Sequence, residues 1–341
     1  MRRLSGITCA IFAILKVCIP DESEDALIFT VESVKDLLLL TGASLPDDDI
    51  NYMILGLHVL ENYGVNFTSQ NMAKTWLDNI PFNFTWGPEN SRYRLFANAM
   101  LFNNGELPKG KDWDELTTLF NDGEELIGAM IRGDSFGMTN PAYPAIAAEM
   151  AYRDGVMTHK KTGLYSEMWV AATIAAAFGT FDPVEAIKIG AEQLPKDARY
   201  TRAVYEALEI SVSEPDWLKA YEKINAKWGY LGHAGTINET AAIINALVHS
   251  VGDDGLVDFE KAICITIMHG WDADCSGATA GCIAGVLAGY HNIPEKWLSP
   301  LCNSYSTCVA TEDDTEIDKL AERMYQMSRI CSAFNDQNFV K

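Results

Sequence analysis

The sequence predicts an all-α protein, because apolar residues recur at helical spacing and the alternating pattern of strands is almost missing. The clearest helix follows three consecutive aspartates, where Ile50, Met53, Ile54, Leu57 and Leu60 fall on one face. The chain has 341 residues, 48% of them hydrophobic, so it can bury a sizeable core. A core of this size suits one large domain or two modest ones.

Proline, glycine and aspartate divide the later part of the chain into further helices. The predicted helices are Pro144–Asp154, Glu167–Phe178, Pro183–Glu192, Tyr200–Ile210, Glu214–Asn225, Ile237–Ser250 and Phe259–Met268. Residues 80–125 are rich in Asn, Gly, Pro and Trp, and we interpret them as long loops with short helices. Residues 311–341 are expected to form a helical tail.

The charge of the chain argues against nucleic acid as a partner. The net charge is −21, from 47 acidic and 26 basic residues, and no run of Lys or Arg forms a local basic patch. No segment reaches the roughly 18 uninterrupted apolar residues that indicate a membrane span. We therefore expect neither nucleic-acid binding by charge nor a membrane-spanning segment.

The cysteines and the N-terminus favour a cytoplasmic protein. None of the eight cysteines forms a Cys-x-x-Cys pair, so we interpret them as reduced, structural thiols, and a zinc site is disfavoured. Met1–Arg3 and the apolar stretch that follows are similar to a secretory signal. Because Lys16 interrupts this stretch and no small-residue cleavage site follows, a buried first helix is favoured, with secretion as the alternative.

Two acidic clusters are the strongest functional signal. Asp47, Asp48 and Asp49 precede one helix, and Asp272 and Asp274 precede another. Carboxylates held this close repel one another, and a divalent cation removes the repulsion most simply; oxygen ligands suit Mg²⁺, Mn²⁺ or Ca²⁺. Helix capping and surface charge are the alternative for each cluster alone. Together, the clusters predict one binuclear metal site.

Glycines at 277, 281, 285 and 289 recur every four residues in the helix that follows the second acidic cluster. Each glycine costs a helix about 1 kcal/mol relative to alanine, so a compensating gain is expected. Close approach of a neighbouring helix supplies such a gain. The glycines by themselves indicate a tightly packed core helix without chemistry.

Four segments in order carry a family resemblance: Pro46–Tyr52, Ile127–Gly137, Ala151–His159 and Gly270–Cys275. Over about residues 40–300, the chain resembles the ADP-ribosylglycohydrolase family. The resemblance implies a single domain spanning residues 1–341, built as an all-α, orthogonal multi-helix bundle with a central metal-binding cleft. It also implies two Mg²⁺ ions, with Mn²⁺ as an alternative, and hydrolysis of the glycosidic bond at C1″ of ADP-ribose in a modified protein or small molecule.

The resemblance assigns metal ligands residue by residue. The two acidic pairs of the family match Asp48, Asp49, Asp272 and Asp274. Asp47 stands where the family usually has Thr or Ser, and Cys275 replaces a small hydroxyl residue. We count both among the expected metal-site residues, although a thiol binds hard cations poorly and one ligand could be lost to a carbonyl or a water.

The resemblance also assigns substrate contacts. Gly128 and Ala129 match a loop that approaches the phosphates or ribose of the ligand, and His159 matches a histidine beside the substrate. A hydrogen-bonded structural histidine is the alternative for His159.

The expected catalytic groups are the carboxylates of Glu22, Asp48 and Asp272, with Glu22 or the Asp272 cluster guiding water as a general base. Residues 1–22 depart from the glycine-rich first helix of the family, and Glu22 matches its glutamate only through the segment Pro20–Glu22. Two alternatives follow: an inactive relative that binds ADP-ribose or has a structural role, and a hydrolase or phosphatase of another nucleotide-like ligand. The acceptor atom, the physiological metal and the oligomeric state are left open.

Overall fold

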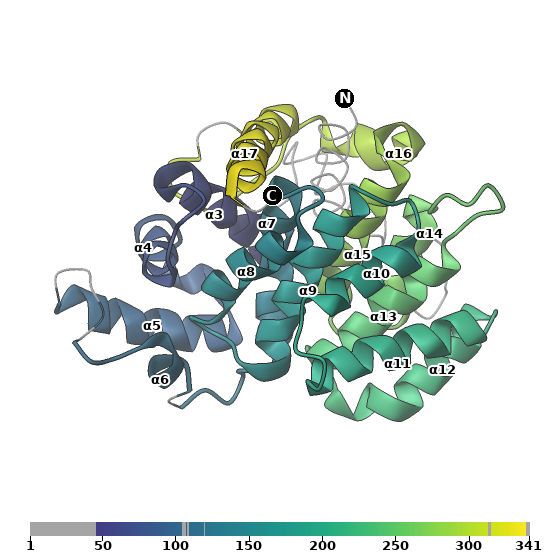
Figure 1. Cartoon of the computed structure of the whole chain (residues 1–341), viewed down its shortest axis with the longest axis horizontal. Helices are drawn as coiled ribbons and strands as arrows, with labels where there is room; N and C mark the ends of the chain where they lie inside the picture. The colour runs from purple at the N-terminus through teal and green to yellow at the C-terminus, as the bar shows by residue number, and fades with distance from the viewer. Residues whose placement is uncertain (1–45, 104–106, 108, 119, 313–314, 339–341) are drawn as a thin grey trace.

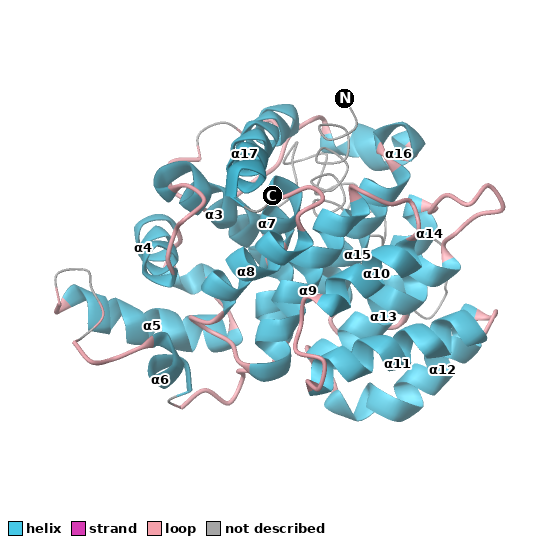
Figure 2. Cartoon of the chain, viewed as in Figure 1, coloured by secondary structure: helices cyan, strands magenta, loops and turns pink. Residues whose placement is uncertain are grey.

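The computed structural model is a bundle of helices joined mostly by short loops (Figure 2). It describes residues 46–103, 107, 109–118, 120–312 and 315–338. Within these ranges the only β-pairing consists of isolated bridges, which confirms the all-α prediction. The same residues include no helix that combines the length and the apolar character needed to cross a membrane. Glu22 and the expected first helix, residues 1–22, lie outside the described residues.

The described α-helices run in chain order through the bundle (Figure 1). They are α3 (Asp48–Tyr63), α4 (Ser69–Asn79), α5 (Gly87–Leu101), α6 (Trp113–Thr118), α7 (Asp134–Thr139), α8 (Pro144–Gly155), α9 (Lys161–Ala177), α10 (Pro183–Glu192), α11 (Arg199–Ser213), α12 (Trp217–Trp228), α13 (Thr236–His249), α14 (Phe259–Met268), α15 (Ala273–Ala288), α16 (Glu295–Leu298) and α17 (Ile317–Asn338). A 3₁₀ segment, η2 (Ile127–Arg132), precedes α7.

Helix α9 lies at the centre of the bundle and packs against α7, α8, α10 and α15 (Figure 1). Its residues are buried almost all round, as expected for a helix with no polar face. Small residues allow close contacts here: a Cβ on Gly137 of α7 would lie only 2.6 Å from the Cβ of Ile174. The central helix therefore fixes the position of η2 and α7, which carry part of the site.

Several predicted boundaries agree with the structure. α10 and α14 have the predicted bounds, whereas α12 begins at Trp217 because Asp216 caps it, its Oδ1 accepting the Leu218 N–H at 3.0 Å. α9 begins at Lys161, ahead of the predicted start at Glu167. The prediction of only short helices in residues 80–125 was wrong, because α5 is 15 residues long. Its few buried side chains leave no continuous apolar stripe to reveal it.

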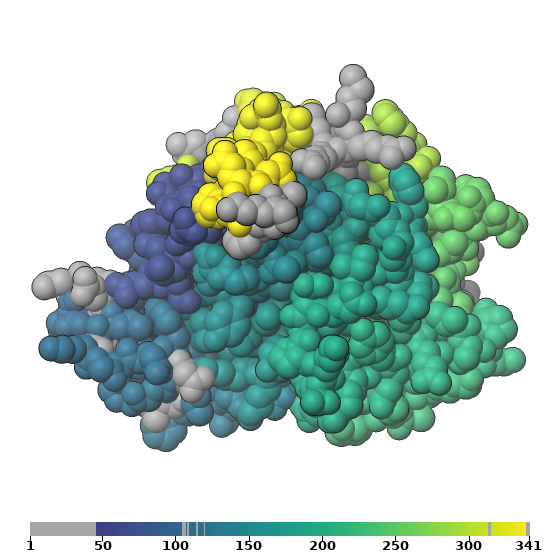
Figure 3. Space-filling view, viewed as in Figure 1, coloured from purple at the N-terminus to yellow at the C-terminus, as the bar shows by residue number. Residues whose placement is uncertain are grey.

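The C-terminal helix α17 lies within the predicted helical tail and packs on α3 (Figure 3). His58 Nε2 of α3 lies 2.7 Å from Glu312 Oε2, and Arg323 Nη2 donates to Glu61 Oε2 at 2.8 Å. These contacts join residues more than 250 positions apart. They hold α3, and with it the first acidic cluster, against the end of the chain.

The glycine-rich helix α15 is buried along most of its length and packs against α14. At Gly277, an added Cβ would lie 3.1 Å from Cγ1 of Ile267 in α14. Gly277 thus allows the close helix approach that the glycine pattern predicted. From Cys275 onward α15 is buried, whereas its first residues, Ala273 and Asp274, are not.

Candidate metal centre and cavity

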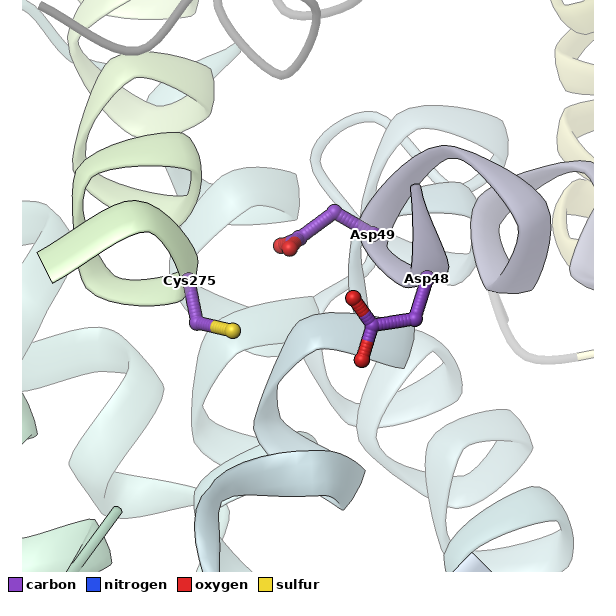
Figure 4. Close-up of side chains that lie close together, drawn as sticks. All are labelled: Asp48, Asp49 and Cys275. Carbon is purple, nitrogen blue, oxygen red and sulfur yellow. The ribbon is translucent and has the colours of Figure 1, made fainter. Parts of the chain in front are cut away.

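The two acidic clusters meet where the N-termini of α3 and α15 face each other (Figure 4). Ligand atoms of Asp48, Asp49 and Cys275 lie within 4.8 Å of one another, and those of Asp272, Asp274 and Cys275 form a second such group. Helix N-termini favour negative charge, which helps the chain to place carboxylates here. The geometry brings the two clusters together at two helix starts, and the binding of metal there stays a prediction.

Asp47 lies differently from the other aspartates. It is the N-cap of α3, and its Oδ1 accepts the backbone N–H of Asp49 at 3.1 Å. Although Asp47 lines the adjoining cavity, it belongs to neither group of gathered ligand atoms. The structure therefore shows Asp47 as a helix cap, and its expected role as a metal-site residue stays a prediction.

The donor set fits divalent cations. The side chain of Asp49 is only 4% exposed, and within the described residues no hydrogen bond reaches its carboxylate. Burial raises its pKa well above the ordinary value, and the neighbouring carboxylates of Asp47 and Asp48 raise it further. A buried carboxylate surrounded by other carboxylates is costly unless a cation neutralises it. Four carboxylates and a thiol can supply such a cation with ligands.

Other acidic groups around the centre have raised pKa values as well. Burial, with a contribution from Asp47, raises the pKa of Asp48 to about 8, and burial together with Asp274 raises that of Asp272 to about 6. Glu239 on α13 accepts the backbone N–H of Asp272 at 2.8 Å, and burial raises its pKa to about 8. These raised pKa values favour the protonated form of part of this cluster near neutral pH.

These shifts predict an unusual pH dependence of stability for the metal-free protein. Asp48 and Glu239, with pKa values of about 8, and Glu89, at about 7, keep protons that the unfolded chain has lost. Their stabilising contribution is complete at low pH and is lost as the pH rises through these values, by about 1.4 kcal/mol per pH unit for each excess proton. Burial lowers the pKa of His159 and His269, and these groups oppose the trend below roughly pH 6.5.

We therefore expect the Tm of the metal-free protein to rise as the pH falls from roughly 8.5 to 6.5. Scanning calorimetry across this range, with and without a saturating divalent cation, measures the effect. The cation should flatten the curve. A Tm that rises with pH over the same interval would contradict the prediction.

A cavity of about 640 Å³ opens beside the acidic centre. Its lining residues are Pro46, Asp47, Asp48, Phe84, Trp86, Gly87, Pro88, Glu89, Leu126, Ile127, Gly128, Ile131, His233, Ala234, Asp272, Asp274 and Cys275. The lining combines the carboxylates and the thiol of the acidic centre with the aromatic rings of Phe84 and Trp86. Trp86 is 63% exposed. The volume lies in the range of small-molecule sites.

Glu89 lines the cavity, although the sequence did not predict it as a site residue. It stands in the first turn of α5, and its Oε1 accepts from Nη1 of Arg132 at 2.9 Å. Burial raises its pKa to about 7, although the Arg132 guanidinium lowers it. Pro88 followed by an acidic residue is a helix-start signal, and this was the only cue in the sequence. That cue indicates a helix and says nothing of a cavity.

Arg132, at the end of η2, is 1% exposed and joins several buried groups. Besides Glu89, its Nε donates to Asp154 Oδ2 at 2.7 Å, its Nη2 donates to Thr158 Oγ1 at 2.8 Å, and Glu167 Oε2 lies 3.5 Å away. Burial raises the pKa of Glu167 well above the ordinary value. This network connects the wall of the cavity to the central helix.

Of the three residues predicted to contact substrate, Gly128 lines the cavity, whereas Ala129 and His159 are buried and do not. Gly128 lines the cavity, and an added Cβ would lie 2.2 Å from Glu89 Oε1, so the glycine leaves room for that carboxylate. Ala129 is fully buried and is not a lining residue. His159 is also fully buried behind the cavity; its Nδ1 lies 2.8 Å from Thr158 Oγ1 and 3.6 Å from Glu89 Oε1. A direct contact of Ala129 or His159 with substrate stays a prediction.

The backbone before α15 is unusual and shapes the second acidic cluster. Gly270 and Trp271 have φ angles of +78° and +60°, so a bulky residue adopts the left-handed region. The Trp271 ring lies against His269 and Tyr221, with centroid distances of 6.2 and 6.3 Å. Packing of this ring holds the strained turn that presents Asp272 to the site.

The helical bundle gathers carboxylates from two helix N-termini beside a cavity of the size that binds small molecules. A family model described as ADP-ribosylglycohydrolase matches residues 21–333. The chain belongs to this family, as the resemblance in its sequence predicted.

Known relatives agree with this family. The chain is 38% identical over 71 residues to "ADP-ribosylarginine hydrolase Tri1" from Serratia proteamaculans (strain 568). The matched segment covers 21% of this chain and 17% of that protein. It is also similar to the solved structure "ADP-ribosylglycohydrolase-related protein complex", with a TM-score of 0.52 and 17% identity, over 96% of this chain and 98% of that one. The structural similarity shows a shared fold.

Proposed function

We propose that the protein is a hydrolase that cleaves the glycosidic bond at C1″ of ADP-ribose in an ADP-ribosylated protein or small molecule. The observation that carries this proposal is the meeting of two carboxylate clusters beside a cavity in a member of the ADP-ribosylglycohydrolase family. Asp48, Asp49, Asp272 and Asp274 would hold two divalent cations, Mg²⁺ or Mn²⁺. When bound, such cations polarise substrate oxygens and lower the pKa of a water molecule.

The residues of the chain support each part of the reaction. Water attacks C1″ as the bond to the acceptor breaks, and one water proton passes to a carboxylate of the Asp272 cluster or to Glu22. That carboxyl group or solvent then supplies the proton that the acceptor takes up as it leaves. The anomeric carbon gains oxocarbenium character, which the surrounding carboxylates stabilise. Glu89 is fixed by Arg132 at the cavity wall, where it can accept a hydrogen bond from a ribose hydroxyl.

The cavity has features suited to the rest of ADP-ribose. Phe84 and Trp86 offer aromatic faces for the adenine. Among the described residues, His233 is the only basic side chain in the lining, and it can donate to a phosphate oxygen. Carboxylates also suit a cationic acceptor such as a guanidinium, and the relative from Serratia is named for ADP-ribosylarginine. ADP-ribosylarginine is therefore the first substrate to test.

The decisive assay measures release of ADP-ribose from ADP-ribosylated arginine and serine peptides by the full chain. We expect turnover that EDTA abolishes and that Mg²⁺ or Mn²⁺ restores. Asp272→Ala should lower kcat/KM by about a thousandfold or more, because a cation contributes several kcal/mol to the transition state. Asp78→Ala, which removes an exposed partner of Lys74, is the matched control. Unchanged turnover in Asp272→Ala would refute the site, and ADP-ribose binding without turnover would indicate a binding module.

A further inference from the structure

Cys275 occupies a central position among the carboxylates. Its sulfur belongs to both groups of gathered ligand atoms, one with Asp48 and Asp49 and the other with Asp272 and Asp274. Figure 4 shows the thiol of Cys275 and the carboxylates of Asp48 and Asp49 directed toward the same space. Among the described residues, Cys275 therefore supplies the ligand atom that the two groups share, whereas each carboxylate belongs to a single group.

The surroundings of Cys275 differ from those of the other buried cysteines. Cys275 is 6% exposed and lines the cavity, whereas Cys282, further along α15, and Cys331 of α17 are fully buried away from it. The sulfur of Cys275 lies close to the carboxylates of both acidic clusters, which packing of a thiol in a core does not require. Asp49 points into the same space and is only 4% exposed. Within the described residues no hydrogen bond reaches its carboxylate, so a cation in this space would neutralise it.

We propose that Cys275 Sγ is a metal ligand shared by the two cation positions, and that this sulfur shifts the preference of the site from Mg²⁺ toward Co²⁺, Fe²⁺ or Zn²⁺. Thiolates bind these ions well, whereas carboxylates and water suit Mg²⁺. As the sulfur–metal bond forms, the thiol proton passes to solvent and a sulfur lone pair makes the bond. The inference rests on the metal site of the proposed function and specifies which metals it selects.

Because both groups share the sulfur of Cys275, its replacement should affect the binding of both cations. Losing Cys275 removes one ligand from each group and leaves two carboxylates in each. Serine at this position keeps the size of the side chain and replaces sulfur with a harder oxygen donor. Cys275→Ser should therefore weaken Co²⁺ binding while leaving Mg²⁺ binding unchanged or stronger.

The test uses Co²⁺, which reports a bound thiolate by a sulfur-to-metal charge-transfer absorption. The full chain is titrated with Co²⁺ after chelation, by absorption and calorimetry, alone and against excess Mg²⁺. We expect the charge-transfer band in the wild type and in the control Cys331→Ser, and its loss in Cys275→Ser. The ratio of Co²⁺ to Mg²⁺ affinity should fall by about tenfold or more in Cys275→Ser.

The outcomes separate this inference from the proposed function. Co²⁺ binding by calorimetry without the band, or a band that persists in Cys275→Ser, overturns the sulfur ligand while the carboxylate site stands. If neither Co²⁺ nor Mg²⁺ binds to the folded wild type, the metal site itself fails and the inference with it. Circular dichroism of each variant verifies that the helices are retained.

Discussion

Replacing Asp49 by asparagine is expected to abolish hydrolysis and, at the same time, to stabilise the metal-free protein near pH 8. The amide keeps the shape of the side chain but cannot neutralise a cation as a carboxylate does, so kcat/KM should fall by about a thousandfold or more. Burial, together with Asp47 and Asp48, raises the pKa of Asp49 well above the ordinary range, which means that ionising this group destabilises the fold.

The N-terminus of α3 works against this gain, because it favours a negative charge in its first turn by about 0.3–1 kcal/mol. Burying a carboxylate among others costs more than that. We expect a net stabilisation on the order of 1 kcal/mol, or a rise of about 2 °C in Tm. Adding Mg²⁺ or Mn²⁺ should raise the Tm of the wild type and have little effect on the variant.

Thermal unfolding with and without cation, alongside the activity assay, measures both effects in one preparation. Asp78→Asn is the control, because Asp78 is 54% exposed and pairs with Lys74 on the surface of α4. It should leave activity, stability and cation response unchanged. An Asp49→Asn protein that is less stable than the wild type without metal, or that retains turnover, would contradict the prediction.

Arg132→Met is expected to be among the most destabilising single substitutions in the described part of the chain. The guanidinium is 1% exposed, contacts Glu89, Asp154 and Glu167, and lies 5.2 Å from the centre of the Trp76 ring. Methionine fills the volume but leaves buried carboxyl groups without their cation, which typically costs about 3–5 kcal/mol. Burial raises the pKa of Glu89 and Glu167, and their protonation recovers part of the loss, so the effect should grow as the pH rises.

Chemical denaturation followed by circular dichroism measures this loss. Lys227→Met is the comparison, because Lys227 forms a single ion pair with Glu206 in which both side chains are 45% exposed; its loss should cost less than about 1 kcal/mol. Arg132→Lys should lie between the two, since an ammonium keeps the charge without the planar set of donors. The prediction fails if Arg132→Met and Lys227→Met destabilise the protein equally.

The helices and the two acidic clusters could be predicted because their signals are local. Apolar spacing and capping residues gave α10 and α14 their bounds, and helix-start position marked Asp48 and Asp272. α5 was not predicted as a long helix, because only some of its side chains reach the core. The spacing of apolar residues predicts a helix reliably when one face of the helix is apolar, and it fails when no face is.

The parts of the site that the sequence did not predict depend on contacts between distant residues. Glu89 and Arg132 are 43 positions apart, and nothing near Glu89 marks it as a cavity residue. Gly128 was predicted from the resemblance as a residue that approaches ligand, but its contact with Glu89 emerges only in three dimensions. Glu239, which holds the backbone of Asp272, was likewise not anticipated.

The position of Trp86 allows ligand binding in the cavity to be measured by intrinsic tryptophan fluorescence. Its ring is largely exposed to water and lines the cavity, whereas Trp76 and Trp169 are fully buried in the core. An indole that exchanges water for a bound ligand changes its emission, whereas the buried Trp76 and Trp169 are expected to respond little. Occupancy of the cavity can therefore be followed by tryptophan fluorescence on the unlabelled protein, with Trp86→Phe as the silent counterpart.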